Sequence, residues 1–107
     1  MKFEVFLTEN AEDDIFDIYT YVQNNDSQLK ADNLFDNLKE TCLKLEELPA
    51  RGHIPSELKR INVVDYLEVH FKPYRIVYQI IENQVFVHCV LDGRRNLQDL
   101  LQERLIR

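Results

Sequence analysis

The hydrophobic and polar positions of the chain follow their clearest pattern between Tyr74 and Arg95. Two runs rich in β-branched and aromatic residues flank three polar residues, Glu82 to Gln84, which predicts a β-hairpin. Side chains alternate between the two faces of a strand, so one face of the hairpin is expected to be almost wholly apolar and the other mixed. We expect a layer of helices over the apolar face, which carries Ile76, Tyr78, Ile80, Val85, Val87, Cys89 and Leu91.

Upstream of the hairpin, the pattern predicts one strand followed by an antiparallel pair of amphipathic helices. Residues 2–7 are apolar at every second position, which indicates a short strand with one apolar face. Thr8 or Asn10 is expected to cap the first helix. A second apolar stripe with three–four spacing follows Ser27 and predicts a long helix that ends at Leu48. The first helix is expected to bury Ala11, Ile15, Phe16, Ile18, Tyr19 and Val22.

The rest of the chain adds a strand before the hairpin and a helix after it. Pro49–Pro55 ends the second helix, and a turn of helix fits Ser56–Ile61 before a strand at Tyr66–Phe71. After Arg95, Asn96 is expected to cap a last helix of about 11 residues, which is too short to be stable alone and must dock on the domain. Its apolar side carries Leu97, Leu100, Leu101 and Leu105.

These elements follow the order β-α-α-β-β-β-α in a single domain of residues 1–107. A chain of 107 residues is long enough for one domain with one hydrophobic core. We therefore expect an α+β fold, a two-layer sandwich with a mostly antiparallel sheet and a helical hairpin on one face.

The charge of the chain differs between its two halves. The net charge is −6, and residues 1–50 carry four basic and twelve acidic groups, whereas residues 51–107 carry nine and seven. An acidic chain is repelled by phosphate backbones, so direct nucleic-acid binding is not expected. Any such contact belongs to the second half.

The apolar segments of the chain point to a cytoplasmic protein. No apolar run approaches the ~20 residues that span a membrane, and the N-terminal sequence Met-Lys-Phe-Glu has no signal-peptide core. Cys42 and Cys89 lie far apart within apolar stretches, and they are expected to be buried free thiols rather than a disulfide.

Three segments, Leu48–Leu58, Tyr74–Tyr78 and Leu91–Leu97, resemble the ParE branch of the RelE/ParE superfamily. These are small toxins of type II toxin–antitoxin modules, often called plasmid stabilisation proteins. The resemblance covers essentially the whole chain, because the family has the same order of a strand, two helices and three strands. It implies one of two activities: RelE-like members cut messenger RNA within the ribosome, whereas ParE-like members poison DNA gyrase. Both kinds are neutralised by an antitoxin whose flexible segment wraps the toxin.

RNA cleavage requires groups that accept and donate a proton, together with cations at the phosphate. RelE-like toxins are expected, by resemblance, to supply these with lysines and arginines on the sheet and with a tyrosine or histidine near the C-terminus. The chain has Arg75, Arg94 and Arg95, but no tyrosine, histidine or lysine follows Arg95. His88 is the nearest substitute, and we interpret a strand histidine as structural. The missing group favours the ParE-like activity.

The remaining candidate chemistry has two open interpretations. The arginines either pair with carboxylates, for which Glu68 and Asp92 are available, or serve as interaction residues. His53, His70 and His88 lack helical i,i+4 spacing and have no neighbouring cysteine motif, so no metal and no cofactor are expected.

The sequence therefore predicts a ParE-like toxin that is not an enzyme, binds DNA gyrase and is silenced by a cognate antitoxin in a toxin–antitoxin hetero-oligomer. The alternatives are a ribosome-dependent mRNA endonuclease that uses the arginines with His88, or a degenerate toxin that only binds its antitoxin. Because of the charge asymmetry, the antitoxin is expected on the sheet side of the C-terminal half. The residues expected to bind the antitoxin or the target are Arg75, Arg94, Arg95, Leu97 and Leu101.

Overall fold

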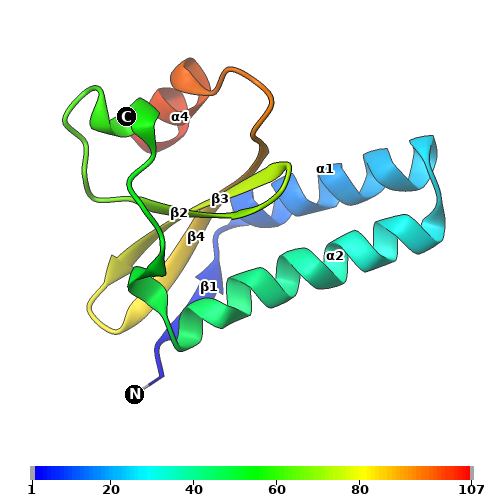
Figure 1. Ribbon diagram of the computed structural model, residues 1–107, viewed down its shortest axis with the longest axis horizontal. Coiled ribbons are helices and arrows are strands. Elements are labelled where there is room, and N and C mark those ends of the chain that lie inside the picture. Colours follow the sequence, from blue (N-terminus) through cyan, green and yellow to red (C-terminus); the bar gives the residue numbers. More distant parts are fainter. Residues whose placement is uncertain (1, 107) are drawn as a thin grey trace.

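A helical hairpin and the sheet that it covers form the two main layers of the protein (Figure 1). The computed structural model describes residues 2–106. The predicted α+β class and element order are confirmed, and the expected turn of helix precedes the second strand. The elements are β1 (Glu4–Leu7), α1 (Glu9–Asn25), α2 (Gln28–Leu43), α3 (Ser56–Lys59), β2 (Leu67–Phe71), β3 (Tyr74–Ile81), β4 (Gln84–Asp92) and α4 (Gln98–Leu105).

The sheet is mixed, with the strand order β1-β4-β3-β2. β3 pairs antiparallel with both β2 and β4, while β1 pairs parallel with β4. The prediction of a mostly antiparallel sheet around the β3–β4 hairpin is therefore confirmed. The turn is shorter than predicted, because Ile81 pairs with Gln84 and leaves only Glu82 and Asn83 between the strands. Glu82 has a φ of 55°, which is the left-handed conformation that such tight turns require.

A β-bulge reverses the two faces of β4 partway along that strand. Val77 pairs with Cys89 and Tyr78 pairs with Val87, which leaves His88 as an extra residue on β4. The alternation of faces therefore shifts by one residue at this point. The predicted apolar face is wrong in this respect: Val85, Val87 and Val90 pack under the helical hairpin, whereas Cys89 and Leu91 belong to a second cluster.

The two long helices begin at side-chain caps and lie side by side (Figure 1). The backbone N–H of Ala11 donates to Thr8 Oγ1 at 3.2 Å, and that of Lys30 donates to Ser27 Oγ at 3.1 Å. Each bond satisfies a donor that the first helical turn leaves without a partner. Thr8, rather than Asn10, is the cap of α1.

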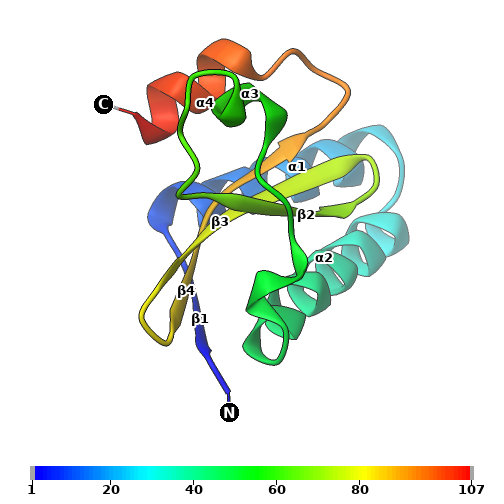
Figure 2. The same cartoon turned by 60° about the vertical axis from the view of Figure 1, so that its left-hand side comes forward.

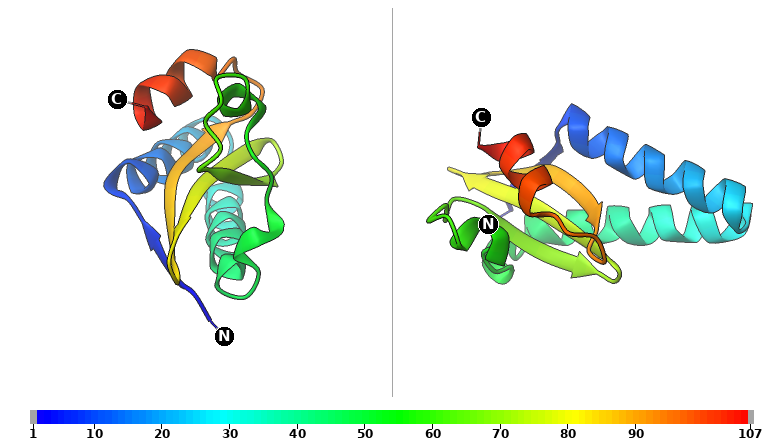
Figure 3. Two further views of the ribbon diagram at one scale, coloured as in Figure 1. Left: turned by 90° about the vertical axis from the view of Figure 1, so that its left-hand side faces the viewer. Right: turned by 90° about the horizontal axis from the view of Figure 1, so that it is seen from above.

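Both helices differ from the prediction in the residues that they bury. α2 ends at Leu43 and continues as a 3₁₀ turn, Lys44–Glu46, instead of an α-helix to Leu48. This turn buries Leu45 and leaves Leu48 exposed. Phe16 of α1 was expected in the apolar stripe but is 67% exposed. The far ends of α1 and α2 extend past the sheet (Figure 3), so the sheet cannot cover their whole length.

A second, smaller apolar cluster lies on the opposite face of the sheet. Val77 belongs to it, whereas the flanking Ile76 and Tyr78 belong to the cluster under the helical hairpin. α3 and α4 lie together and cover this face (Figure 2). The docking of the last helix is confirmed by its leucines, which are buried in or packed against the second cluster: Leu97, Leu100, Leu101 and Leu105.

Two further expectations concern the thiols and the membrane. Cys42 and Cys89 are buried free cysteines, as predicted, and they lie in different clusters. Within residues 2–106, no helix has the length and apolar character needed to cross a membrane.

Candidate functional site

The arginine cluster, which consists of His53, Glu57, Glu68, His70 and Arg75, joins three elements around one guanidinium. Arg75 lies on β3, Glu68 on the edge strand β2 and Glu57 on α3. Nε of Arg75 donates to Glu68 Oε1 at 2.5 Å, and Nη1 and Nη2 each donate to Glu57 at 2.7 Å. Nη2 also donates to Glu68 Oε2 at 3.1 Å. All three nitrogens are therefore engaged by carboxylates.

The ion pairs of this cluster are largely shielded from water. The side chains of Arg75 and Glu57 are 14% exposed and that of Glu68 is 3% exposed. Hydrogen bonds from Arg75 lower the pKa of Glu57 to about 2. Hydrogen bonds to Glu57 raise the pKa of Arg75 above its ordinary value, with a further contribution from Glu68. Two carboxylates therefore face a single guanidinium.

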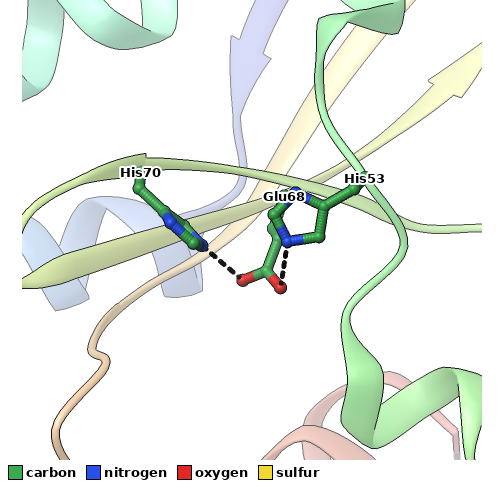
Figure 4. A group of neighbouring side chains, drawn as sticks. All are labelled: His53, Glu68 and His70. Atoms are coloured by element: carbon green, nitrogen blue, oxygen red, sulfur yellow. Dashed lines mark ion pairs between the residues drawn. The ribbon is translucent and has the colours of Figure 1, made fainter.

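Two histidines approach the buried carboxylate of Glu68 (Figure 4). His53 Nε2 lies 3.2 Å from Glu68 Oε2, and His70 Nε2 lies 3.3 Å from Glu68 Oε1. The two rings meet edge to face, with their centroids 5.3 Å apart. His70 shares a face of β2 with Glu68 because residues two apart on a strand point the same way. That i,i+2 spacing was the sequence signal for this group, which the search for helical and cysteine spacings missed.

The link that carries His53 is anchored to the sheet by Tyr78. The Tyr78 hydroxyl donates to the carbonyl oxygen of Pro49 at 2.5 Å and accepts from the N–H of Gly52 at 3.2 Å. The backbones of His53 and Glu68 exchange two hydrogen bonds, of 3.1 and 2.7 Å. A Cβ at Gly52 would lie 2.6 Å from both the Tyr78 hydroxyl and the Glu68 carbonyl oxygen, so this close approach requires glycine.

The arginine pocket, a hollow of about 340 Å³, opens between the β2–β3 turn and the end of β4. Gly93 allows the two segments to meet, because a Cβ there would lie 2.9 Å from Arg75 Cδ and from the Pro73 carbonyl oxygen. Arg94 is 72% exposed, and its Nη2 donates to Asp92 Oδ2 at 2.7 Å. The pocket is lined by His70, Lys72, Pro73, Tyr74, Arg75, Gly93 and Arg94.

Of the three arginines singled out in the sequence, the structure brings Arg75 and Arg94 to this pocket. Arg95 follows in the chain and is exposed. The predicted carboxylate partners are present, since Arg75 pairs with Glu68 and Arg94 pairs with Asp92. Contact of any of these arginines with an antitoxin or a target stays a prediction.

His88, the suggested substitute for a proton-transfer residue, lies in the bulge of β4, away from the arginine pocket. Its Nε2 is 3.1 Å from Gln79 Oε1, and its ring packs edge to face on Tyr66. Burial lowers the pKa of His88, so the imidazole is neutral near pH 7. Burial also raises the pKa of Cys42 and Cys89 to about 11, which keeps both thiols protonated and unreactive.

Leu97 and Leu101, also predicted to bind a partner, are in the second cluster. They are 1% and 0% exposed, so they offer no surface to a partner while α4 is docked. Arg104 of α4 donates to Asp14 of α1 at 2.5 Å, and the N–H of Val90 donates to the same carboxylate at 3.0 Å. A binding role for the two leucines therefore stays a prediction that requires the release of α4.

The hairpin groove runs between α1 and α2 and has a volume of about 710 Å³. Its most exposed apolar side chains are Phe16 at 67%, Leu43 at 44% and Phe35 at 42%. Tyr19 packs edge to face on Phe35, and its hydroxyl donates to Asp32 at 2.6 Å. A concave surface with exposed aromatic side chains is typical of an interaction site. Phe16 was expected in the core, and the spacing of apolar residues does not reveal this surface.

Solved structures share this fold at low sequence identity. A chain of the chromosomal ParDE toxin–antitoxin system from P. aeruginosa is 13% identical, with a TM-score of 0.70 over 83% of this chain and 94% of that chain. A chain of the RelBE2 toxin–antitoxin complex from Mycobacterium tuberculosis is 17% identical, with a TM-score of 0.65 over 86% and 92%. A mutant of the E. coli toxin RelE in the free state is 18% identical, with a TM-score of 0.65 over 100% and 98%.

Sequence comparison identifies the family. A search of curated proteins gave no match. The family model described as "ParE toxin of type II toxin-antitoxin system, parDE" matches residues 5–97. This range includes all three segments that carry the resemblance noted in the sequence, Leu48–Leu58, Tyr74–Tyr78 and Leu91–Leu97. The chain belongs to the ParE toxin family of type II toxin–antitoxin systems.

Proposed function

We propose that this toxin inhibits DNA gyrase by binding it, catalyses no reaction of its own, and is neutralised by a cognate antitoxin. The observation that carries this proposal is the engagement of Arg75. Its guanidinium donates four hydrogen bonds to Glu57 and Glu68. A nuclease needs its cationic groups free to stabilise a phosphate, whereas this arginine is already neutralised within the protein.

The groups that would move protons in RNA cleavage are also unsuited to that role. Residues 96–107 contain no tyrosine, histidine or lysine. His88 is half-buried, and it contacts Gln79 and Tyr66 rather than the arginine pocket. A nuclease without a positioned acid or base forgoes a contribution of about 10²–10⁴ in rate. Inhibition by binding requires no such group.

Arg94 and Arg95 are the residues that we propose for contact with gyrase. Both are exposed, and they lie in the half of the chain that has more basic than acidic groups. The pair between Arg94 and Asp92 is exposed to water, so it is weak and is readily exchanged for a partner's carboxylate. Arginine is also enriched among the residues that dominate binding energy at protein interfaces.

The antitoxin is proposed to occupy the hairpin groove with an amphipathic helix that carries basic residues beside its apolar face. Phe16, Phe35 and Leu43 would receive the apolar face, as in other helix-in-groove complexes. Glu12 and Asp32 also line the groove, against Lys39, so the excess of acidic groups would attract the basic residues. This revises the expectation of docking on the sheet side, because α3 and α4 already cover part of that side.

Two reactions with the purified toxin test its mode of action. The toxin is expected to increase the amount of DNA held in the gyrase cleavage complex and to leave messenger RNA on translating ribosomes intact. Ribosome-dependent RNA cleavage with no effect on gyrase would overturn the proposal in favour of the endonuclease. Loss of both activities in a toxin that still binds its antitoxin would identify a degenerate toxin.

Hydrogen exchange with and without the antitoxin tests the docking surface separately. Protection is expected in α1 and α2 on both sides of the groove. Protection confined to residues 66–95 would instead support docking on the sheet side and would show that the antitoxin does not bind the hairpin groove.

A further inference from the structure

We propose that His53, Glu68 and His70 form a binding site for a divalent transition-metal ion, with Zn²⁺ as the best-suited ion. The three side chains come from two segments that the fold brings together, the link after α2 and the edge strand β2 (Figure 4). Their ligand atoms all lie within 4.8 Å of one another. The proposal rests on this geometry alone and is independent of the toxin's target.

The distances between the ligand atoms fit a zinc coordination sphere. Zinc binds imidazole nitrogen and carboxylate oxygen at about 2.0–2.2 Å in tetrahedral geometry, so neighbouring ligand atoms are about 3.3–3.6 Å apart. The two imidazole–carboxylate distances, from His53 and His70 to Glu68, are 3.2 and 3.3 Å. The two imidazoles approach different oxygens of Glu68, so an ion bound by all three groups requires the exposed imidazoles to shift toward a shared position within the 4.8 Å that the ligand atoms span.

The charges around the site favour a cation and hold its carboxylate in place. Glu68 is 3% exposed and is held from the other side by Arg75. This is the supporting role that partners of metal-binding carboxylates usually play. The positive charge of Arg75 opposes a metal ion, but Glu57 pairs with the same guanidinium. Within the cluster, two carboxylates share one guanidinium, which favours a cation locally, while the cations Lys72 and Arg94 line the adjoining pocket.

The two imidazoles determine which ions fit and how they enter. Nitrogen ligands favour Zn²⁺ and related transition metals over Mg²⁺ and Ca²⁺, which take oxygen ligands. The side chains of His53 and His70 are 63% and 39% exposed, so an ion reaches the site from solvent. Three protein ligands leave a fourth position for water. A bound ion would connect the link to β2 and stabilise the folded chain.

Zinc titration of the metal-free chain, followed by calorimetry, tests the site. One Zn²⁺ per chain is expected, with no detectable heat from Mg²⁺. Loss of a direct ligand weakens metal binding more than loss of a residue that only supports a ligand. His53→Ala and His70→Ala should therefore each weaken zinc binding by at least about 100-fold. His88→Ala removes the histidine that lies outside the cluster, and this variant should bind like the unmodified protein.

Spectra of the Co²⁺-loaded chain identify the ligands. The unmodified protein should show no thiolate charge-transfer band, and His70→Cys should restore binding and introduce that band. A rise in melting temperature with Zn²⁺ should accompany binding and disappear in His53→Ala. The proposal is overturned if the unmodified chain takes up no Zn²⁺ in excess metal, or if His53→Ala and His70→Ala bind as tightly as His88→Ala.

Discussion

The arginine cluster and the hairpin groove differ in which kind of side chain they bury and which they expose. In the cluster, groups that normally stay in water are enclosed, and Glu68 is 3% exposed. In the groove, an aromatic side chain that normally lies in a core is open to water, since Phe16 is 67% exposed. The cluster supplies partners for its charges from within the chain, whereas the groove leaves its apolar atoms uncovered.

This difference indicates which region supports the fold and which region awaits a partner. A buried charge is costly unless a counter-charge meets it, so the members of the arginine cluster hold one another in place. An exposed apolar surface contributes to stability only once something covers it. The cluster therefore serves as part of the scaffold, and the groove is the interface that we propose. Different residues of this small domain therefore serve folding and recognition.

The largest expected effect comes from removing the cover of the second cluster. Truncation after Asn96 deletes α4 and exposes the surface that Leu97 and Leu101 fill. Each buried leucine is worth about 1.5–3 kcal/mol, so the free energy of unfolding should fall by about 3–6 kcal/mol, and the melting temperature should drop. The second cluster would then be open to water, as the hairpin groove already is.

Chemical denaturation measures this effect, with Asp99→Ala on the exposed side of the same helix as the control. That control is expected to change stability by less than about 0.5 kcal/mol. A truncated chain as stable as the control would mean that α4 is a free arm rather than part of the scaffold.

The next effect concerns the centre of the arginine cluster. Arg75→Ala leaves Glu57 and Glu68 close together without their counter-charge, and the loss of one partner from a buried pair destabilises by about 3–5 kcal/mol. Arg94→Ala breaks an exposed pair and should change stability by about 1 kcal/mol or less. Equal effects of the two substitutions on the unfolding midpoint in urea would show that Arg75 is not a structural residue.

A smaller effect is the pH dependence that Glu57 contributes. Its pKa is lowered from 4.5 to about 2 in the folded chain. Between these values the unfolded chain binds the extra proton, so stability is fully present above pH 4.5 and is lost as the pH falls toward 2. Denaturation at a series of pH values should give a shallower slope in this window for Glu57→Gln. An unchanged slope would mean that the pairing of Glu57 with Arg75 does not contribute to the pH dependence of stability.

The smallest effect on folding is expected in the groove. Phe16→Ser should change the free energy of unfolding by less than about 0.5 kcal/mol, because the side chain is mostly exposed. The same change should weaken antitoxin binding by about 30-fold or more, as expected for a residue at the centre of an interface. Tyr21→Ser is the matched control, since Tyr21 lies on the same helix and is also 67% exposed. Equal loss of affinity in both variants, measured by calorimetry, would argue against the groove.

The elements of the fold were predictable because each has a regular hydrophobic period. The two helices, the hairpin and the docking of α4 all follow from side-chain spacing. The bulge at His88 was not predictable, because one extra residue in β4 is visible only when the two strands are aligned. It moved Cys89 and Leu91 to the face opposite Val85 and Val87.

The ion pairs of the site were predictable only where the partners were close in sequence. Asp92 lies two residues from Arg94, and Glu68 was identified as available to Arg75. Glu57 reaches Arg75 from α3, and no local pattern reveals that contact. His53 meets Glu68 because the link forms a backbone bridge to the edge strand β2 and is also held to β3 by Tyr78. The groove was missed because Phe16 was placed in the apolar stripe beside Ile15, whereas only Ile15 is buried and Phe16 stays exposed.

The central claim is that this toxin acts by binding, with exposed arginines rather than an acid–base residue. The most direct test compares His88→Ala with the double variant Arg94→Ala/Arg95→Ala in parallel gyrase and ribosome reactions. We expect His88→Ala to trap gyrase on DNA as well as the unmodified toxin does, the double variant to lose this activity, and none of the three proteins to cut RNA. Ribosome-dependent RNA cleavage by the unmodified toxin that disappears in His88→Ala would contradict this expectation.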